Sequence, residues 1–460
     1  MLPANLLHAI ADPAGGRVLL VVGAGCSVEP PTSLPLSDAC AREAHRRLVA
    51  DGRLTEGDCG DPGDLSCVAD AVVAATGSQR ELVRRLPCTE FRQAQPNEGH
   101  LLAAAMLREG AVSCVLTLNF DLAMSSALTQ VGSRDDVAII AGPEDHRDLG
   151  MANLIYLHRN VNADPETLIL RSSALDEEWR GHWEEVIVAK ALGAPVTVFV
   201  GLGTPSAVLV DSTLRIRRAL ADTVVVYQVD PGNREDSAFF AKLALPDDAY
   251  LQMSWVAFMR DLGRRLVEEH RTDLERACEE LLEAEGWERE DVGGLCRRLA
   301  ELGLIRLGRV RARWLLADAG YVPRRAVEAA WLADLLLAVG LIERTTGSRA
   351  VFGEDGVVEF RHNNRIAGSV VLATGRGFRR WLVLEARIRQ SERHWEHRDP
   401  RPRRALVAGV PDGQPLPITP PTDVVSEEDP DDIVTGETTF EMFGVDQLRQ
   451  TPELAERILA

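Results

Sequence analysis

Lysine is almost absent from this 460-residue sequence, and positive charge is in deficit. Its 51 basic residues include only two lysines and face 70 acidic residues, so the formal net charge is −19. Such a balance disfavours nonspecific attraction to nucleic acid or anionic membranes. The other composition values, 45% hydrophobic and 26% charged residues, are typical of a globular chain. We therefore expect a folded protein that does not bind nucleic acid directly.

Cysteine pairs at metal-binding spacing are also missing. The eight cysteines contain no C-x-x-C pair, the spacing on which many zinc sites depend. Their scatter is typical of reduced, buried thiols in a cytoplasmic protein, so we expect no metal and no disulfide framework. The cysteines are Cys26, Cys40, Cys59, Cys67, Cys88, Cys114, Cys278 and Cys296.

No apolar run reaches the roughly 18 residues that a membrane span requires. The best candidate, Ala329 to Ile342, is short and carries Asp334. The first residues lack the basic segment that opens a signal peptide. These features favour a cytoplasmic protein with no membrane partner.

Short apolar runs alternate with helical patterns from Arg17 to Val229. Leu19–Val22 is apolar throughout and ends at a glycine, as expected for a strand buried on both faces of a parallel sheet. Strand and helix in repeated order predict an α/β fold with a doubly wound, Rossmann-like parallel sheet. The comparable runs are Val112–Leu118, Leu154–Leu157, Pro195–Val200 and Thr223–Val229.

The strand-type runs stop at about Met253, and amphipathic helices follow. A hairpin with its turn at Gly353–Gly356 comes after them, which fits either a winged-helix module or a plain helical support domain. We predict an α/β domain at 1–265, a helical or winged-helix-like domain at 266–360, and a C-terminal segment at 361–460. The expected helices are Trp255–His270, Asp273–Glu285, Asp291–Leu302 and Arg324–Leu341.

The two halves of the C-terminal segment carry opposite charge. Residues 361–410 have a net charge of +8, and residues 411–460 have a net charge of −10. The basic half contains Trp381, Trp395 and His397, as a nucleic-acid or phosphate surface would. Because the two charges nearly cancel, we favour pairing between the halves, within the protein or across subunits. Pro411–Pro421 is proline-rich and predicts a linker.

Glycines and short polar residues follow the predicted strands. Gly23–Ser27 follows the first strand, and glycine there lets backbone amides approach a phosphate, although glycine after a buried strand is also common in ordinary turns. Asn119 and Asp121 follow the second strand, where doubly wound folds bind ligands, but an Asx turn would use the same residues. His158 and Asp230 end later strands, and each also has a purely structural interpretation.

In this order the motifs resemble the sirtuin family over roughly residues 15 to 265. Gly23–Ser27 matches its G-A-G-x-S opening, and Pro96–His100 matches a P-N-x-x-H helix start. Thr117–Asp121 matches T-x-N-x-D, and Leu157–His158 stands where the family has an L-H dipeptide with its catalytic histidine. Gly201–Thr204 stands for a later ribose and phosphate loop.

The departures from the family are equally informative. Sirtuin deacylases carry a zinc module built on two C-x-x-C pairs, and this chain has none. The D-F-R triplet after the first glycines is missing, and Arg159 replaces the glycine that follows the histidine. Such changes are typical of the sirtuin-like branch in bacterial anti-phage systems, whose members resemble NAD+ glycohydrolases.

The resemblance implies that the chain cleaves NAD+ to nicotinamide and ADP-ribose, with NAD+ as substrate and no metal. It implies catalytic roles for Asn119, which positions ribose hydroxyls and water, and His158, which accepts a proton, with Asp121 in support. The implied NAD+-binding residues are Gly23, Ala24, Gly25, Ser27, Asn119, Asp121, His158, Gly201, Gly203, Thr204 and Asp230.

Two other functions stay open. The first is an NAD-dependent protein deacylase, which the missing zinc cysteines disfavour. The second is a non-enzymatic sensor of NAD+ or ADP-ribose. Because uncontrolled loss of NAD+ kills a cell, an NAD+ hydrolase of this branch would be a regulated effector of abortive infection. We expect a homo-oligomer or a co-encoded partner such as an ATPase, a nuclease or an Argonaute-like protein.

Overall fold

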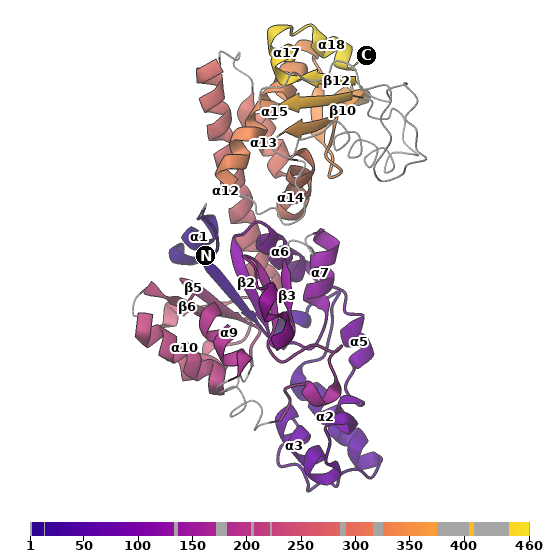
Figure 1. Cartoon of the computed structure of the whole chain (residues 1–460), viewed down its shortest axis with the longest axis vertical. Coiled ribbons are helices and arrows are strands. Elements are labelled where there is room, and N and C mark those ends of the chain that lie inside the picture. The colour runs from indigo at the N-terminus through magenta and orange to yellow at the C-terminus, as the bar shows by residue number, and fades with distance from the viewer. Residues whose placement is uncertain are drawn as a thin grey trace. The chain divides into compact units, whose positions relative to one another are not determined.

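The computed structural model divides the chain into two compact units, Met1–Arg265 and Leu266–Ala460. Figure 1 shows both units, which are described separately below. The structure describes residues 2–12, 14–132, 137–171, 182–203, 207–220, 223–285, 291–315, 325–374, 404–408 and 441–459.

A seven-stranded parallel sheet forms the centre of the first unit, in the order β3-β4-β2-β1-β5-β6-β7. The predicted doubly wound α/β fold is therefore confirmed. The sequence missed only the two short edge strands, β3 and β7, which have three residues each. The strands are β1 (Val18–Val22), β2 (Val112–Thr117), β3 (Ala138–Ile140), β4 (Asn153–Tyr156), β5 (Val196–Val200), β6 (Val225–Asp230) and β7 (Tyr250–Gln252).

Helices cover the sheet because its central strands are apolar on both faces. Every residue of β1 and β5 is buried, which is the pattern of inner strands in a parallel sheet. The covering helices include α1 (Ala4–Ala11), α6 (Glu98–Arg108), α7 (Ala123–Val131), α9 (Trp183–Ala191), α10 (Ala207–Leu220) and α11 (Ala238–Leu243).

Four further helices lie between β1 and β2 in the chain. They are α2 (Ser37–Ala50), α3 (Leu65–Thr76), α4 (Arg80–Val83) and α5 (Cys88–Arg92). They bury a separate apolar core that also takes in Val161, Leu168 and Leu170 from the chain after β4. Figure 1 shows α2 and α3 at one end of this unit, away from the strands.

Helix α12 (Trp255–Glu285) replaces the two helices predicted on either side of residue 271. No proline or glycine lies between the two predicted segments, and Arg271 pairs with both Glu268 and Glu275 one turn to either side. Ion pairs at this helical spacing stabilise a continuous helix, so the predicted break is wrong.

The second unit packs helices against a five-stranded mixed sheet with the order β12-β11-β10-β9-β8. The hairpin of β8 and β9 is present, but three more strands extend it beyond a winged-helix hairpin. The helices are α13 (Val292–Ala300), α14 (Gly303–Trp314), α15 (Arg325–Thr346), α17 (Val445–Gln450) and α18 (Leu454–Leu459). The strands are β8 (Arg349–Phe352), β9 (Val357–His362), β10 (Arg365–Thr374), β11 (Arg404–Ala408) and β12 (Glu441–Gly444).

The expected boundary between residues 360 and 361 falls inside β9, so the two C-terminal domains are one unit. One apolar core draws on residues from Leu274 to Ile458, and this shared burial joins both segments. Most of the basic and acidic stretches, including Trp381, Trp395 and the proline-rich segment, lie outside the described residues.

Two further observations concern the cysteines and the helices. All eight cysteines are free thiols, and six of them are buried. Within the described part of the chain, no helix is long and apolar enough to cross a membrane.

Candidate functional site

The carboxyl ends of the parallel strands meet at one edge of the sheet, and the chain changes direction across the sheet at β1. Strands β2 and β4 lie on one side of β1, and β5 and β6 lie on the other. Ligands of doubly wound folds bind outside the strand ends at such a switch point. The sequence-predicted residues after β1, β2, β4, β5 and β6 all follow strands at this edge.

Three glycines let the loops after β1 and β5 touch through their backbones. The Gly23 amide donates to the Val200 carbonyl at 3.0 Å, and the Gly25 amide donates to the Gly201 carbonyl at 2.9 Å. A Cβ atom on Gly25 would lie 2.7 Å from the Gly201 Cα, and Gly201 itself has a φ of +63°. No other residue fits this contact, so these glycines have a packing role that the sequence analysis did not assign.

This contact changes the expected role of the glycine-rich turn. Gly23 and Gly25 each donate their amide within the protein, and the Cys26 amide donates to the Gly23 carbonyl at 3.0 Å. These three amides are therefore unavailable to a phosphate. Ala24 and Ser27 belong to the same turn, a 3-10 helix over Ala24–Ser27. The sequence predicted that backbone amides of this turn would be open to a phosphate, and this prediction is wrong for the amides of Gly23, Gly25 and Cys26.

A buried hydrogen-bond chain connects the ends of β1 and β2. Ser27 donates its hydroxyl to Asp121 Oδ2 at 2.9 Å, and the other carboxylate oxygen accepts from the Ala123 amide at 2.9 Å. Asn119 donates its Nδ2 to the Gly23 carbonyl at 3.0 Å and to Ser27 Oγ at 3.3 Å. All three polar side chains are at most 9% exposed. The structure therefore brings Ser27, Asn119 and Asp121 together.

The chain of hydrogen bonds fixes which end of the Asn119 amide is available. A carboxylate only accepts, so Ser27 must donate to Asp121 and can accept from Asn119. Both Asn119 Nδ2 hydrogens are then used inside the protein, and no described residue donates to Oδ1, which is therefore the group left for a ligand. Asn119 can accept a hydrogen bond from a hydroxyl or a water. Asp121 also forms the Asx-type bond at the start of α7, so its structural interpretation is correct as well.

The strand register places His158 and Asn119 at matching positions beyond adjacent strands. Thr117 of β2 pairs with Tyr156 of β4, and each functional side chain comes two residues later. Burial lowers the pKa of His158 to about 4, although a hydrogen bond with the Leu118 backbone raises it slightly. The ring is therefore neutral near pH 7 and can accept a proton. Its centroid is 6.4 Å from that of Phe120.

Asp230 ends β6, two strands from β1 on the side opposite His158. Its Oδ1 accepts from the Gly232 amide at 2.7 Å, which makes the turn that the sequence allowed. Burial and the neighbouring Asp230 raise the pKa of Tyr250 to about 12, so that tyrosine stays protonated. A side chain added at Gly203 would meet open space, and Thr204 lies outside the described residues.

The Pro96–His100 segment supports the glycine-rich turn through hydrogen bonds from the Asn97 side chain. Asn97 donates its Nδ2 to the Cys26 carbonyl at 2.9 Å and to the Glu29 carbonyl at 3.3 Å. It also caps α6 in a reciprocal capping box with His100. Burial lowers the pKa of His100 to about 3, so this ring is a neutral acceptor. The sequence analysis used these residues only as part of a resemblance. Asn97 followed three residues later by His100, a pairing that can cap a helix start, was the sequence signal for their positioning role.

Glu29 is a residue that the sequence analysis missed. Its carboxylate accepts from the Ser254 hydroxyl at 3.1 Å and from the Val256 amide at 2.9 Å. These contacts tie the chain after the glycine-rich turn to the first turn of α12. No sequence signal links positions so far apart.

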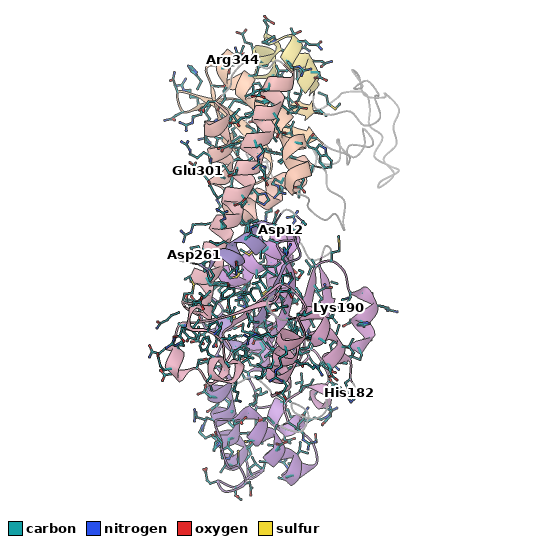
Figure 2. The ribbon with its side chains drawn as sticks, turned by 90° about the vertical axis from the view of Figure 1, so that its left-hand side faces the viewer. Asp12, His182, Lys190, Asp261, Glu301 and Arg344 are labelled. Carbon is teal, nitrogen blue, oxygen red and sulfur yellow. The ribbon has the colours of Figure 1, made fainter. Side chains whose placement is uncertain are left out.

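A cavity of about 360 Å³ lies next to the turn that carries His158. It is lined by α3, the chain before α4, the residues that follow β4 and the start of α9. His182, labelled in Figure 2, is one of the lining residues. The others include Gln79, Arg159, Glu166, Arg171 and Glu184. Across the described ranges, no group of three or more histidine, cysteine, aspartate or glutamate side chains could hold a metal ion.

Comparison with solved structures finds proteins of low similarity to this chain. The chain is similar to a variant of a Sir2 homologue in complex with ADP-ribose, with 15% identity, a TM-score of 0.35 and coverage of 58% of this chain and 97% of that one. It is similar to a Sir2 homologue in complex with NAD, with 15% identity, a TM-score of 0.33 and coverage of 58% and 95%. No family model matches the sequence, and no curated protein matches it. The function proposed below therefore rests on this chain's own residues.

Proposed function

We propose that this chain hydrolyses the bond between nicotinamide and ribose in NAD+, releasing nicotinamide and ADP-ribose. The observation that supports the proposal is the placement of Asn119 and His158 at matching positions beyond adjacent strands, with a free amide oxygen on one and a neutral imidazole on the other. A module that only bound the dinucleotide would have little need for both groups.

The width of the sheet edge suits an extended ligand. His158 and Asp230 follow β4 and β6, which are four strand spacings apart, or roughly 19 Å. In this proposal Asp230, with Gly203 and Thr204, holds the adenosine half, and the nicotinamide ribose lies near Asn119. The pyrophosphate passes over Gly23–Ser27, where small side chains leave room for it.

The reaction needs little covalent chemistry from the protein. Nicotinamide leaves as a neutral group, and positive charge develops on the ribose as in other glycosidic cleavages. Asn119 Oδ1 accepts a hydrogen bond from a ribose hydroxyl or the attacking water and so orients it. His158 takes the proton as the water oxygen forms its bond to the anomeric carbon. NAD+ and water thus give ADP-ribose, nicotinamide and one proton.

The decisive test is nicotinamide release by the purified chain and by an Asn119→Ala variant. Loss of a positioned polar group in the transition state costs about 10²- to 10³-fold in rate, so turnover by Asn119→Ala should fall by that factor. Asn153→Ala is the matched control, because this amide lies at the opposite end of β4 and its side-chain hydrogen bonds to described residues are with the Gly150 backbone. Wild-type turnover by Asn119→Ala would refute the proposal, whereas NAD+ binding without any turnover by the wild type would favour a sensor.

We further propose that this activity belongs to a regulated, cytoplasmic effector of bacterial anti-phage defence. The sirtuin-like motifs without a zinc module support this role, and so does the danger of unregulated NAD+ loss. The active form would be a homo-oligomer or a complex with a co-encoded protein. Sizing with and without NAD+, together with cellular NAD+ levels during phage infection, tests the proposal. Unchanged NAD+ levels in infected cells that express the chain and its genomic neighbours would contradict it.

A further inference from the structure

Arg159, the residue after His158, has a left-handed backbone with a φ of +69°. In the described part of the chain, four other residues besides glycine have a positive φ: Ser33, Ala244, Asn363 and Asn364. Long side chains seldom adopt this conformation, which persists only where the surroundings enforce it. Glycine would adopt this conformation without strain, whereas arginine needs contacts with its surroundings to hold it there.

Three contacts hold the Arg159 guanidinium. Nη1 donates to the Ala141 carbonyl at 3.2 Å, and Nη2 lies 3.4 Å from Glu184 Oε1. The Cζ atom is 4.8 Å from the centroid of the Trp183 ring, a cation–π distance. Ala141 follows β3, and Trp183 and Glu184 begin α9, so the side chain links the end of β4 to two other elements. Glu184 is buried, and the Arg159 guanidinium is the positive group paired with it.

We infer that Arg159 is a positioning residue that holds the turn carrying His158 against the start of α9. This inference rests on the proposed function of His158 as the proton acceptor. The two residues share a peptide group, and the Arg159 amide donates to the Tyr156 carbonyl at 3.3 Å to close the turn. The Ile169 amide reaches the His158 carbonyl at 3.5 Å, a long hydrogen bond. Backbone bonds from Leu157 to Thr117 and from Val161 to Phe120, both 2.9 Å, hold the two ends of this segment, and the guanidinium adds a side-chain link from the turn itself to α9 and to the chain after β3.

The backbone and the side chain of Arg159 can be tested separately. Arg159→Gly keeps the left-handed turn without strain and removes the guanidinium. Because it also leaves Glu184 buried without its partner, the Arg159→Gly/Glu184→Gln double variant removes that charge. Ala244→Gly is the matched control, since Ala244 has a φ of +46° at the end of α11 and takes no part in the Arg159 contacts. A general destabilisation from glycine at a position of positive φ would appear in all three variants, whereas loss of the guanidinium would appear only in the two Arg159 variants.

The first readout is the ring titration of His158, followed by NMR without any substrate. In the wild type we expect a pKa of about 4. In the double variant the loosened turn admits water to the ring, so its pKa should move toward the ordinary value of about 6.5. The Ala244→Gly protein should titrate as the wild type does. An unchanged His158 titration in the double variant would overturn the inference, whether or not the chain hydrolyses NAD+.

The second readout is nicotinamide release. We expect kcat of the double variant to fall by about 10²-fold with little change in KM, because a misplaced catalytic group affects the chemical step more than binding. Arg159→Lys should recover only part of the loss, since an ammonium cannot match the planar contacts of a guanidinium. Wild-type kcat in the double variant would refute the positioning role. Absence of turnover in the wild type would instead refute the proposed function and leave the titration to decide.

Discussion

The two units bury polar networks of different kinds. In the first unit Asp121, Ser27 and Asn119 form a directed chain that ends in one amide oxygen without a hydrogen-bonding task. In the second unit Arg311 of α14 pairs with Glu328 of α15 and contacts His270 of α12 at 3.1 Å, within an apolar core. The first network leaves a group for a ligand, whereas the second satisfies its charges within the fold. A buried polar network therefore indicates a functional site only when one of its polar atoms can still bond to a ligand.

The largest expected effect concerns the proton acceptor at the open network. His158→Ala should reduce nicotinamide release by about 10²- to 10⁴-fold, the usual contribution of a positioned general base. His8→Ala is the control, because His8 is exposed on α1. Circular dichroism should show an intact fold in both variants. Retention of wild-type turnover by His158→Ala would show that His158 is not the proton acceptor and would contradict a catalytic site at the network of the first unit.

The second prediction breaks the network of the other unit. Glu328→Gln leaves the buried Arg311 charge without its carboxylate, which should cost about 3–5 kcal/mol of unfolding free energy. Glu354→Gln is the control, since its pairs with Arg306 and Arg309 are exposed and should contribute at most about 1 kcal/mol. Denaturant unfolding measures both values. Equal small losses in the two variants would show that the buried pair is not a stabilising element.

The third prediction reverses the direction of the open network. In Asp121→Asn the side-chain oxygen keeps the Ala123 amide, so the new amide group donates to Ser27. The Ser27 hydroxyl then points toward Asn119 Nδ2, which is itself a donor held by the Gly23 carbonyl, so the Asn119–Ser27 hydrogen bond is lost and Asn119 keeps one anchor instead of two. We expect a loss of transition-state stabilisation of about 1.5–3 kcal/mol, the strength of a charge-assisted hydrogen bond. Nicotinamide kinetics measure it, and Asp121→Asn activity equal to that of the wild type would show that the Ser27 hydrogen bond does not position Asn119.

The smallest expected effect is a pH dependence of the unfolding free energy that arises from His158. Folding lowers the pKa of His158 from about 6.5 to about 4, so the unfolded chain binds the extra proton between these values. This contribution to stability is complete above pH 6.5 and is lost as the pH falls, by about 2 kcal/mol between pH 7 and pH 5. Burial raises the pKa of Asp121, which acts in the opposite direction at lower pH. His158→Asn should flatten the stability profile between pH 5 and pH 7, and an unaltered slope would contradict this assignment.

Much of the first unit could be predicted from sequence because its inner strands are apolar on both faces. Runs such as Leu19–Val22 do not depend on distant contacts to be recognised as buried strands. The edge strands β3 and β7 could not be found in this way, since three residues carry too little pattern. In the second unit α13 and α15 were predicted, whereas α14, α17 and α18 were not, and the mixed sheet joins strands from beyond residue 361 that only tertiary pairing reveals.

The sequence by itself determined which residues stand at the ends of the strands, because strand polarity and residue order are local properties. Asn119, Asp121 and His158 could be selected for that reason. The tertiary structure decided how they are used: it engages the amides of Gly23 and Gly25 in backbone hydrogen bonds, directs Asn119 Nδ2 to acceptors within the protein and keeps His158 neutral. Hydrogen-bond direction and desolvation depend on neighbours that are far apart in the chain, such as Ser27 and Asp121, and no local pattern encodes them.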